Sequence, residues 1–250
     1  MTNTPNIPDT HPIIEVQALI KAFGLMPVLR GINLEIPRGQ CVALLGPNGS
    51  GKSTLLRLLT GLSKPTAGIV KIGGWELPHE GMAVRAQIGM VSHKPLLYGD
   101  LTAYENLRFF AGLYDLDGEA MDTRIHALLD QVGLKKRRND LARNFSRGMQ
   151  QRLSIARALL HDPDVLIFDE PYTGLDQQAG ATLDTLLTTA RDGGRTIVMA
   201  THQLDRAARL SDRAIILSRG KIAYDGITAG LDPIQLARDY AEVTGEVVAR

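Results

Sequence analysis

The sequence has little from which a disulfide framework, a membrane span or a nucleic-acid surface could be built. Its one cysteine, Cys41, excludes an internal disulfide and suits a reducing compartment. No apolar run approaches the about 18 residues of a spanning helix, and the first residues lack the charged and apolar segments of a secretory signal. Lysine and arginine number 28 against 27 acidic residues, a net charge of +1 that argues against a dedicated nucleic-acid binder. We therefore expect a soluble chain that reaches a membrane only through a partner.

What is present is enough for a large α/β domain. The 250 residues are 44% hydrophobic and 22% charged, which disfavours disorder and coiled coil. Residues 1–12 carry three prolines and are predicted to be flexible, whereas residues 231–250 are predicted to form a helical tail.

Short apolar runs alternate with helical patterns from residue 13 onward. This alternation predicts a parallel sheet with helices on both faces. A helix is predicted at 52–62, ended by Gly61 or soon after. Helices are also predicted throughout 101–160, where Thr102 and Glu105 have the spacing of a capping box and Gly133 stops the second helix. The predicted buried strands are 41–45, 88–91, 165–168, 196–200 and 214–217.

A glycine-rich segment follows the first of these strands and opens a helix. It reads Gly46-Pro47-Asn48-Gly49-Ser50-Gly51-Lys52-Ser53-Thr54 and fits the phosphate-loop pattern G-x-x-x-x-G-K-[ST]. Glycines allow successive amides to turn toward a phosphate, and the helix start adds the positive end of its dipole. Lys52 supplies a cation for the phosphate oxygens, and the Ser53 hydroxyl is a candidate Mg²⁺ ligand. The segment predicts nucleotide binding.

Two acids follow the apolar strand at 165–168. Asp169, at the carboxyl end of a buried strand, is the second candidate ligand of Mg²⁺. Glu170 comes next and is the candidate group that polarises an attacking water. Together with the phosphate loop, the pair predicts nucleotide hydrolysis.

A third motif, Asn144-Phe145-Ser146-Arg147-Gly148-Met149-Gln150-Gln151-Arg152, resembles the signature of ATP-binding-cassette (ABC) ATPases. The similarity continues through residues 153–160, 169–171 and 174–176, and it covers about 13–226. The resemblance implies one nucleotide-binding domain at 13–230, with a P-loop NTPase α/β core and mostly parallel sheet. It also implies an N-terminal antiparallel β part and an inserted α-helical subdomain at about 95–162.

The resemblance also implies roles for single residues. Phe23 matches the aromatic residue that stacks on adenine, and His202 matches the histidine that senses the γ-phosphate. His93 takes the place of a glutamine that couples Mg²⁺ and water to the membrane part. The signature residues Ser146, Arg147, Gly148 and Met149 would face the ATP of a partner cassette, and Asp176 would link the two ATP sites. A pair of cassettes, identical or not, with ATP and Mg²⁺ is therefore implied.

The chain departs from the common signature Leu-Ser-Gly-Gly-Gln, since Arg147 replaces a glycine and Met149 replaces the glutamine. His93-Lys94-Pro95 and residues 101–110 look like the ATPase subunit of the haem exporter in cytochrome c maturation. We therefore expect a peripheral subunit on the cytoplasmic face of the membrane that powers a permease for haem export. A general exporter of drugs, lipids or polysaccharides is the alternative. A soluble cassette protein acting on a macromolecular complex is the alternative of another class, disfavoured by the charge balance and the single cassette.

Overall fold

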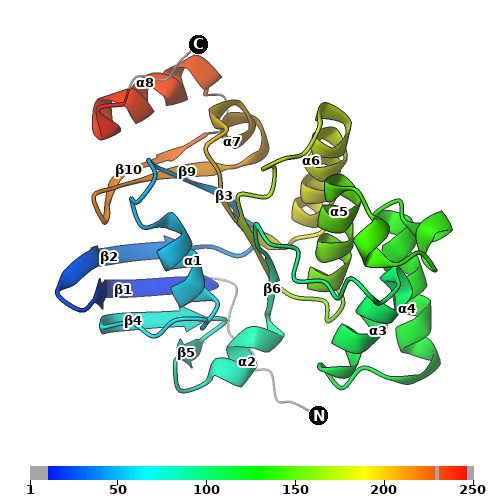
Figure 1. Ribbon diagram of the computed structural model, residues 1–250. Coiled ribbons are helices and arrows are strands. Elements are labelled where there is room, and N and C mark those ends of the chain that lie inside the picture. Colours follow the sequence, from blue (N-terminus) through cyan, green and yellow to red (C-terminus); the bar gives the residue numbers. More distant parts are fainter. Residues whose placement is uncertain (1–10, 229–230, 247–250) are drawn as a thin grey trace. The chain divides into compact units, whose positions relative to one another are not determined.

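The structure is a computed structural model that describes residues 11–228 and 231–246 (Figure 1). Its chain divides into two compact units, one formed by the residues up to Arg85 and from His202 onward, the other by Ala86–Thr201. Most of the predicted flexible segment at 1–12 lies outside the described residues, as do residues 229–230 and 247–250.

The first unit begins with an antiparallel sheet in the order β2-β1-β4-β5. Along β2 the side chains of Ile32, Leu34 and Ile36 are buried and alternate with exposed ones, the pattern of a sheet with one face packed on a core. This sheet is the antiparallel β part that the family resemblance implied. Its strands are β1 (Ile14–Phe23), β2 (Met26–Ile36), β4 (Ala67–Ile72) and β5 (Trp75–Leu77), and the short helix α2 (Gly81–Ala86) follows.

The remaining strands of the first unit hold the phosphate loop. β3 pairs in parallel with β9, which pairs antiparallel with β10. Asp212 fixes the start of β3, because its carboxylate accepts a hydrogen bond from the amide of Cys41 at 2.8 Å. Leu236 of α8 and Ala207 of α7 share a buried cluster with Leu45 and Ile216. The elements are β3 (Cys41–Leu45), α1 (Lys52–Leu59), α7 (Leu204–Leu210), β9 (Arg213–Ser218), β10 (Lys221–Ile227) and α8 (Pro233–Thr244).

Helix α1 begins at Lys52 as predicted and ends just before Gly61, the predicted stop. It ends at Leu59 with Thr60 as its C-cap, and the next residue, Gly61, has a φ of 68°. Glycine adopts this left-handed backbone without strain and so terminates the helix.

The second unit carries three parallel strands in the order β8-β7-β6 and the helical part. All five residues of β7 and of β8 are buried, as expected for strands covered on both faces. The predicted capping box is confirmed at α3, where Thr102 accepts from the amide of Glu105 and Glu105 accepts from that of Thr102. The elements are β6 (Ile88–Val91), α3 (Ala103–Gly112), α4 (Gly118–Gln131), the 3₁₀ turns Lys135–Arg137 and Ala142–Asn144, α5 (Arg147–Ala158), β7 (Val165–Asp169), α6 (Gln177–Asp192) and β8 (Thr196–Ala200).

Candidate functional site

The phosphate loop connects β3, whose five residues are all buried, to α1. At its first residue, Gly46, φ is 141°, and a Cβ would lie 2.2 Å from the carbonyl oxygen of Leu217 in β9. Both the backbone angle and the close approach require glycine. The sequence pattern thus places a glycine where the loop leaves the core against β9.

A buried cation and a helix start face this loop. Lys52 is 8% exposed, and its ammonium donates to the carbonyls of Gly46 at 2.6 Å and Pro47 at 3.1 Å. The N-cap of α1 is Gly51, so no side chain caps the helix, unlike α3, α5 and α6. The hydroxyl of Ser50 is buried and has no hydrogen-bond partner within residues 11–228 and 231–246. A phosphate fits this set of groups, because it brings negative charge and acceptor oxygens to all of them.

Phe23 is the last residue of β1 and pairs with Met26 of β2. Phe23 is 57% exposed, and the Lys21 ammonium lies 4.8 Å from the centre of its ring. A ring so exposed offers a flat apolar surface to an aromatic ligand.

The two acids that follow the apolar run at 165–168 differ in their surroundings. Asp169 is the buried last residue of β7, whereas Glu170 is partly exposed. Glu170 has a φ of 51°, a left-handed conformation that costs a non-glycine residue about 1–2 kcal/mol. Two backbone hydrogen bonds hold it there, since its amide donates to the Ala200 carbonyl at 2.9 Å and its carbonyl accepts from Thr173 at 3.2 Å. Strain maintained in this way is typical of functional positions.

The signature segment begins α5 and contacts the start of α6 within the second unit. The Ser146 hydroxyl accepts from the amide of Met149 at 3.3 Å and so caps α5. The Asp176 carboxylate caps α6 in the same way, accepting from Ala179 at 2.8 Å. A Cβ on Gly148 would lie 2.9 Å from that of Ala179, so glycine allows the two helices to approach.

Arg147, the departure from the common signature, has a contact that spacing did not predict. Its guanidinium covers Gly174, where a Cβ would lie 2.3 Å from an arginine nitrogen. Gly174 has a φ of 74° and lies two residues before Asp176. The structure therefore joins the signature segment to the loop at 174–176 of the same chain.

His93 lies on an exposed segment that follows β6. Helix α5 holds this segment, because Ser154 donates to the Pro95 carbonyl at 2.8 Å and Arg157 donates to Leu96 at 3.1 Å. Burial lowers the pKa of the Arg157 guanidinium from its ordinary value. The helix that begins at the signature thus also fixes the loop of His93.

The predicted site residues fall into two groups, one in each unit. The first unit holds Phe23, the phosphate loop at 46–54 and the exposed His202. The second unit holds His93, residues 146–149, Asp169, Glu170 and Asp176. Within the described part of the chain, no group of three or more His, Cys, Asp and Glu side chains is placed to hold a metal ion.

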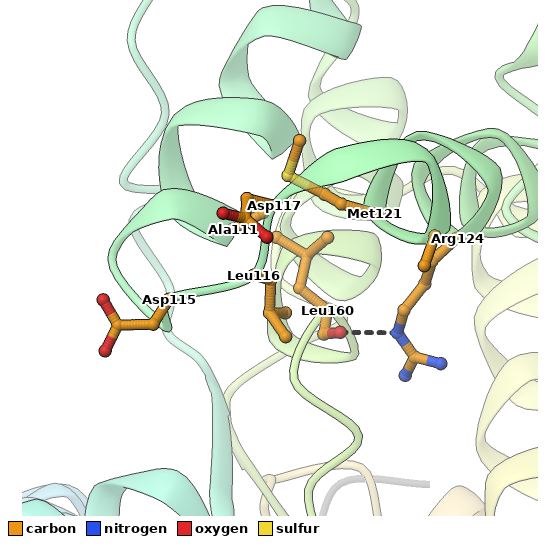
Figure 2. Close-up of a pocket in the computed structure, with 8 residues that line it drawn as sticks. Ala111, Asp115, Leu116, Asp117, Met121, Arg124 and Leu160 are labelled. Atoms are coloured by element: carbon orange, nitrogen blue, oxygen red, sulfur yellow. Dashed lines mark hydrogen bonds between the residues drawn. The ribbon is translucent and has the colours of Figure 1, made fainter.

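A cavity of about 270 Å³ lies elsewhere, in the helical part of the second unit (Figure 2). Its walls are mostly apolar, and Arg124 at one side donates to the Leu160 carbonyl. The lining residues are Ala111, Asp115, Leu116, Asp117, Ala120, Met121, Arg124 and Leu160. None of the residues predicted from the sequence to bind nucleotide lines it.

Comparison with known proteins gives a consistent result. Residues 29–173 match the family model described as ABC transporter. The Nod factor export ATP-binding protein I of Cupriavidus pinatubonensis is 37% identical over 240 residues, which are 96% of this chain and 74% of that protein.

Solved cassettes have the same fold. CbiO1 of Clostridium perfringens, described as part of the ABC transporter complex CbiONQ, has a TM-score of 0.82 and 28% identity, covering 93% of this chain and 95% of its own. The dimeric cassette MJ0796, bound to ADP and phosphate in a post-hydrolysis state, has a TM-score of 0.78 and 30% identity, covering 86% and 98%.

Proposed function

Since the chain belongs to the ABC transporter family and is an ATPase subunit of that family, we propose that it powers an exporter as one cassette of a dimer docked on a membrane permease. None of the described helices is long and apolar enough to cross a membrane. The proposal assigns the cargo pathway to a separate subunit, as in the CbiONQ complex of the similar cassette CbiO1, with this chain at the cytoplasmic face of the membrane.

In this proposal the first unit binds ATP. Phe23 stacks on the base, the amides of the loop at 46–54 hold the phosphates, and the Lys52 ammonium moves from the loop carbonyls to the phosphate oxygens. The orphaned Ser50 hydroxyl and the uncapped start of α1 support this assignment. Ser53 and Asp169 would supply oxygen ligands of the kind Mg²⁺ prefers, and His93 is a further candidate ligand through a ring nitrogen. The ion would neutralise phosphate charge.

In this proposal the residues that act in hydrolysis follow β7 and β8. The Glu170 carboxylate accepts a proton from the attacking water, and its constrained backbone limits where that carboxylate can point. His202, which follows β8 by two residues, senses the γ-phosphate. These roles extend the family resemblance to this chain.

The signature segment acts on the partner cassette's nucleotide. Ser146 and Gly148 at the start of α5 offer helix amides to an anion, and this chain's own phosphate loop already serves its own nucleotide. The dimeric state of the similar cassette MJ0796 supports pairing. Asp176 beside the signature segment then links the two sites, and His93 transmits the state of the site to the permease.

The cargo is proposed from the curated relatives. The observation that carries it is the 37% identity to a Nod factor export ATP-binding protein over 96% of the chain. A second protein of that description, from Ralstonia nicotianae, is 36% identical over 97% of the chain. These relatives favour the general exporter of drugs, lipids or polysaccharides over the haem exporter predicted from His93-Lys94-Pro95 and residues 101–110, and we correct that prediction accordingly.

Gentle extraction of the tagged chain from its native membranes, followed by identification of the co-purifying proteins, tests this function. A membrane permease that travels with the chain, together with normal c-type cytochromes in a deletion strain, is the expected result. Co-purification with cytochrome c assembly proteins and loss of those cytochromes would restore the haem exporter. Ribosomes or a soluble scaffold in place of any permease would overturn the transport function.

A further inference from the structure

The ammonium group of Lys21 lies over one face of the Phe23 ring. The separation is 4.8 Å from Nζ to the ring centre, within the range of a cation–π contact. Phe23 as a residue is nevertheless 57% exposed. Lys21 thus covers part of the ring and leaves a large aromatic surface available to a ligand.

Lys21 is itself held by the segment that connects α1 to β4. Its ammonium donates to the Lys64 carbonyl at 2.9 Å. Nearby, the amide of Ala22 donates to the Thr66 hydroxyl at 3.0 Å, and the Thr66 amide donates to the Ile20 carbonyl at 2.9 Å. The end of β1 is therefore fixed by the segment that follows the phosphate-loop helix, so the aromatic ring and the phosphate loop share one support.

The other side chains at this turn are apolar. Leu25 is fully exposed and Met26 is 74% exposed. A base bound against Phe23 would therefore meet a stacking surface and apolar neighbours. Stacking of this kind tolerates different bases, since every base presents a π face.

We propose that Lys21 is a positioning residue for the nucleotide base, which orients the Phe23 ring so that the base stacks on a prearranged surface. This inference rests on the proposed function, since it takes ATP as the ligand. Without Lys21 the ring gains rotamer freedom that base binding must then remove. The loss concerns the base alone, because the phosphate loop has its own cation in Lys52.

The test measures dissociation constants by calorimetry on the full chain with Mg²⁺ present, for ATP, GTP and inorganic tripolyphosphate. Lys21→Met keeps the length of the side chain and removes the charge, and Lys21→Arg keeps a cation that can donate to the Lys64 carbonyl. Lys221→Met is the matched control, because it removes the same charge from an exposed position on β10. Phe23→Ala, alone and with Lys21→Met, shows whether the lysine acts through the ring.

Lys21→Met is expected to weaken the binding of ATP and GTP by about two- to fivefold, which corresponds to an exposed cation–π contact, and to leave the affinity for tripolyphosphate unchanged. Lys21→Arg restores the affinity, and Lys21→Met causes no further loss in the Phe23→Ala background. If Lys21→Met weakened the binding of tripolyphosphate as much as that of ATP, or bound ATP as tightly as Lys221→Met does, the role of Lys21 would be overturned. A wild-type chain that binds tripolyphosphate but not ATP or GTP would overturn both the proposed function and this inference.

Discussion

Replacement of Gly46 by alanine is the sharpest test of the phosphate loop's geometry. A Cβ there would lie 2.2 Å from the Leu217 carbonyl oxygen and 2.8 Å from the Ser50 hydroxyl. Leu217 is fully buried in β9 and pairs with Ile222 of β10, so its carbonyl has little room to retreat. The φ of 141° adds strain of about 1–3 kcal/mol for any other residue. With the overlap included, we expect a loss of at least about 4 kcal/mol of unfolding free energy, which is exceptional for one substitution.

Gly49→Ala is the matched control, because it makes the same change in the same loop. Gly49 has a φ of 77°, and nothing lies within 4 Å of a Cβ built on it. Only the left-handed backbone is penalised, at about 1–2 kcal/mol. For a chain of this size, about 2–4 °C of melting temperature corresponds to each kcal/mol, so the control should lose about 2–8 °C and Gly46→Ala more.

Thermal and urea unfolding followed by circular dichroism measure both variants, and calorimetry with Mg-ATP measures binding at a temperature where each is folded. Gly46→Ala should also lose ATP binding, since relief of the overlap displaces the start of the loop. Equal melting temperatures for the two variants would refute the reasoning, because the close approach to Leu217 would then carry no energy.

Five further substitutions test other site residues and contacts. Lys52→Ala should abolish ATP binding in calorimetry, and a retained micromolar affinity would remove the phosphate-site assignment. Glu170→Gln should bind ATP, release no phosphate and accumulate as a dimer in size-exclusion chromatography, whereas wild-type turnover would exclude its role as base. Gly174→Ala should lower the free energy of unfolding in urea by about 1–2 kcal/mol or more. Adding Arg147→Gly to that variant should recover part of the loss, whereas strictly additive effects of the two substitutions would contradict the contact between Arg147 and Gly174. Burial lowers the pKa of His161 from its ordinary value of 6.5, so the folded state binds fewer protons than the unfolded state below that pH. The free energy of unfolding should therefore fall as the pH drops below about 6.5. His161→Gln should flatten that fall, and an unchanged slope of stability against pH would refute the attribution to His161.

The elements best predicted from sequence are those fixed by local chemistry. The strand at 41–45 agrees with β3 because five consecutive apolar residues end at Gly46. The capping box of α3 is formed as predicted because Thr102 and Glu105 satisfy each other's amides over four residues. The stop of α1 at Gly61 follows the same rule, since the backbone turns there although Leu62 comes next in the leucine pattern.

Other features depend on contacts between distant segments, for which spacing gives no signal. The left-handed backbone of Glu170 depends on Ala200, thirty residues further along the chain. The contact of Arg147 with Gly174 joins two loops that only the packing of α5 and α6 brings together. A positive charge in the signature was visible as a departure from the family pattern, but its partner emerges only from the fold.

The haem prediction was wrong because the tripeptide behind it lies on the surface of the protein. His93-Lys94-Pro95 occupies an exposed segment held by Ser154 and Arg157 of α5. A short surface motif of this kind reflects the support and the contacts of its own loop, and in the proposed function the cargo passes through a different subunit. Similarity over 96% of the chain instead samples the core and both groups of site residues at once. The proposed exporter class therefore rests on the whole chain rather than on the tripeptide, and the role we propose for His93 is to couple ATP hydrolysis to the permease rather than to select the cargo.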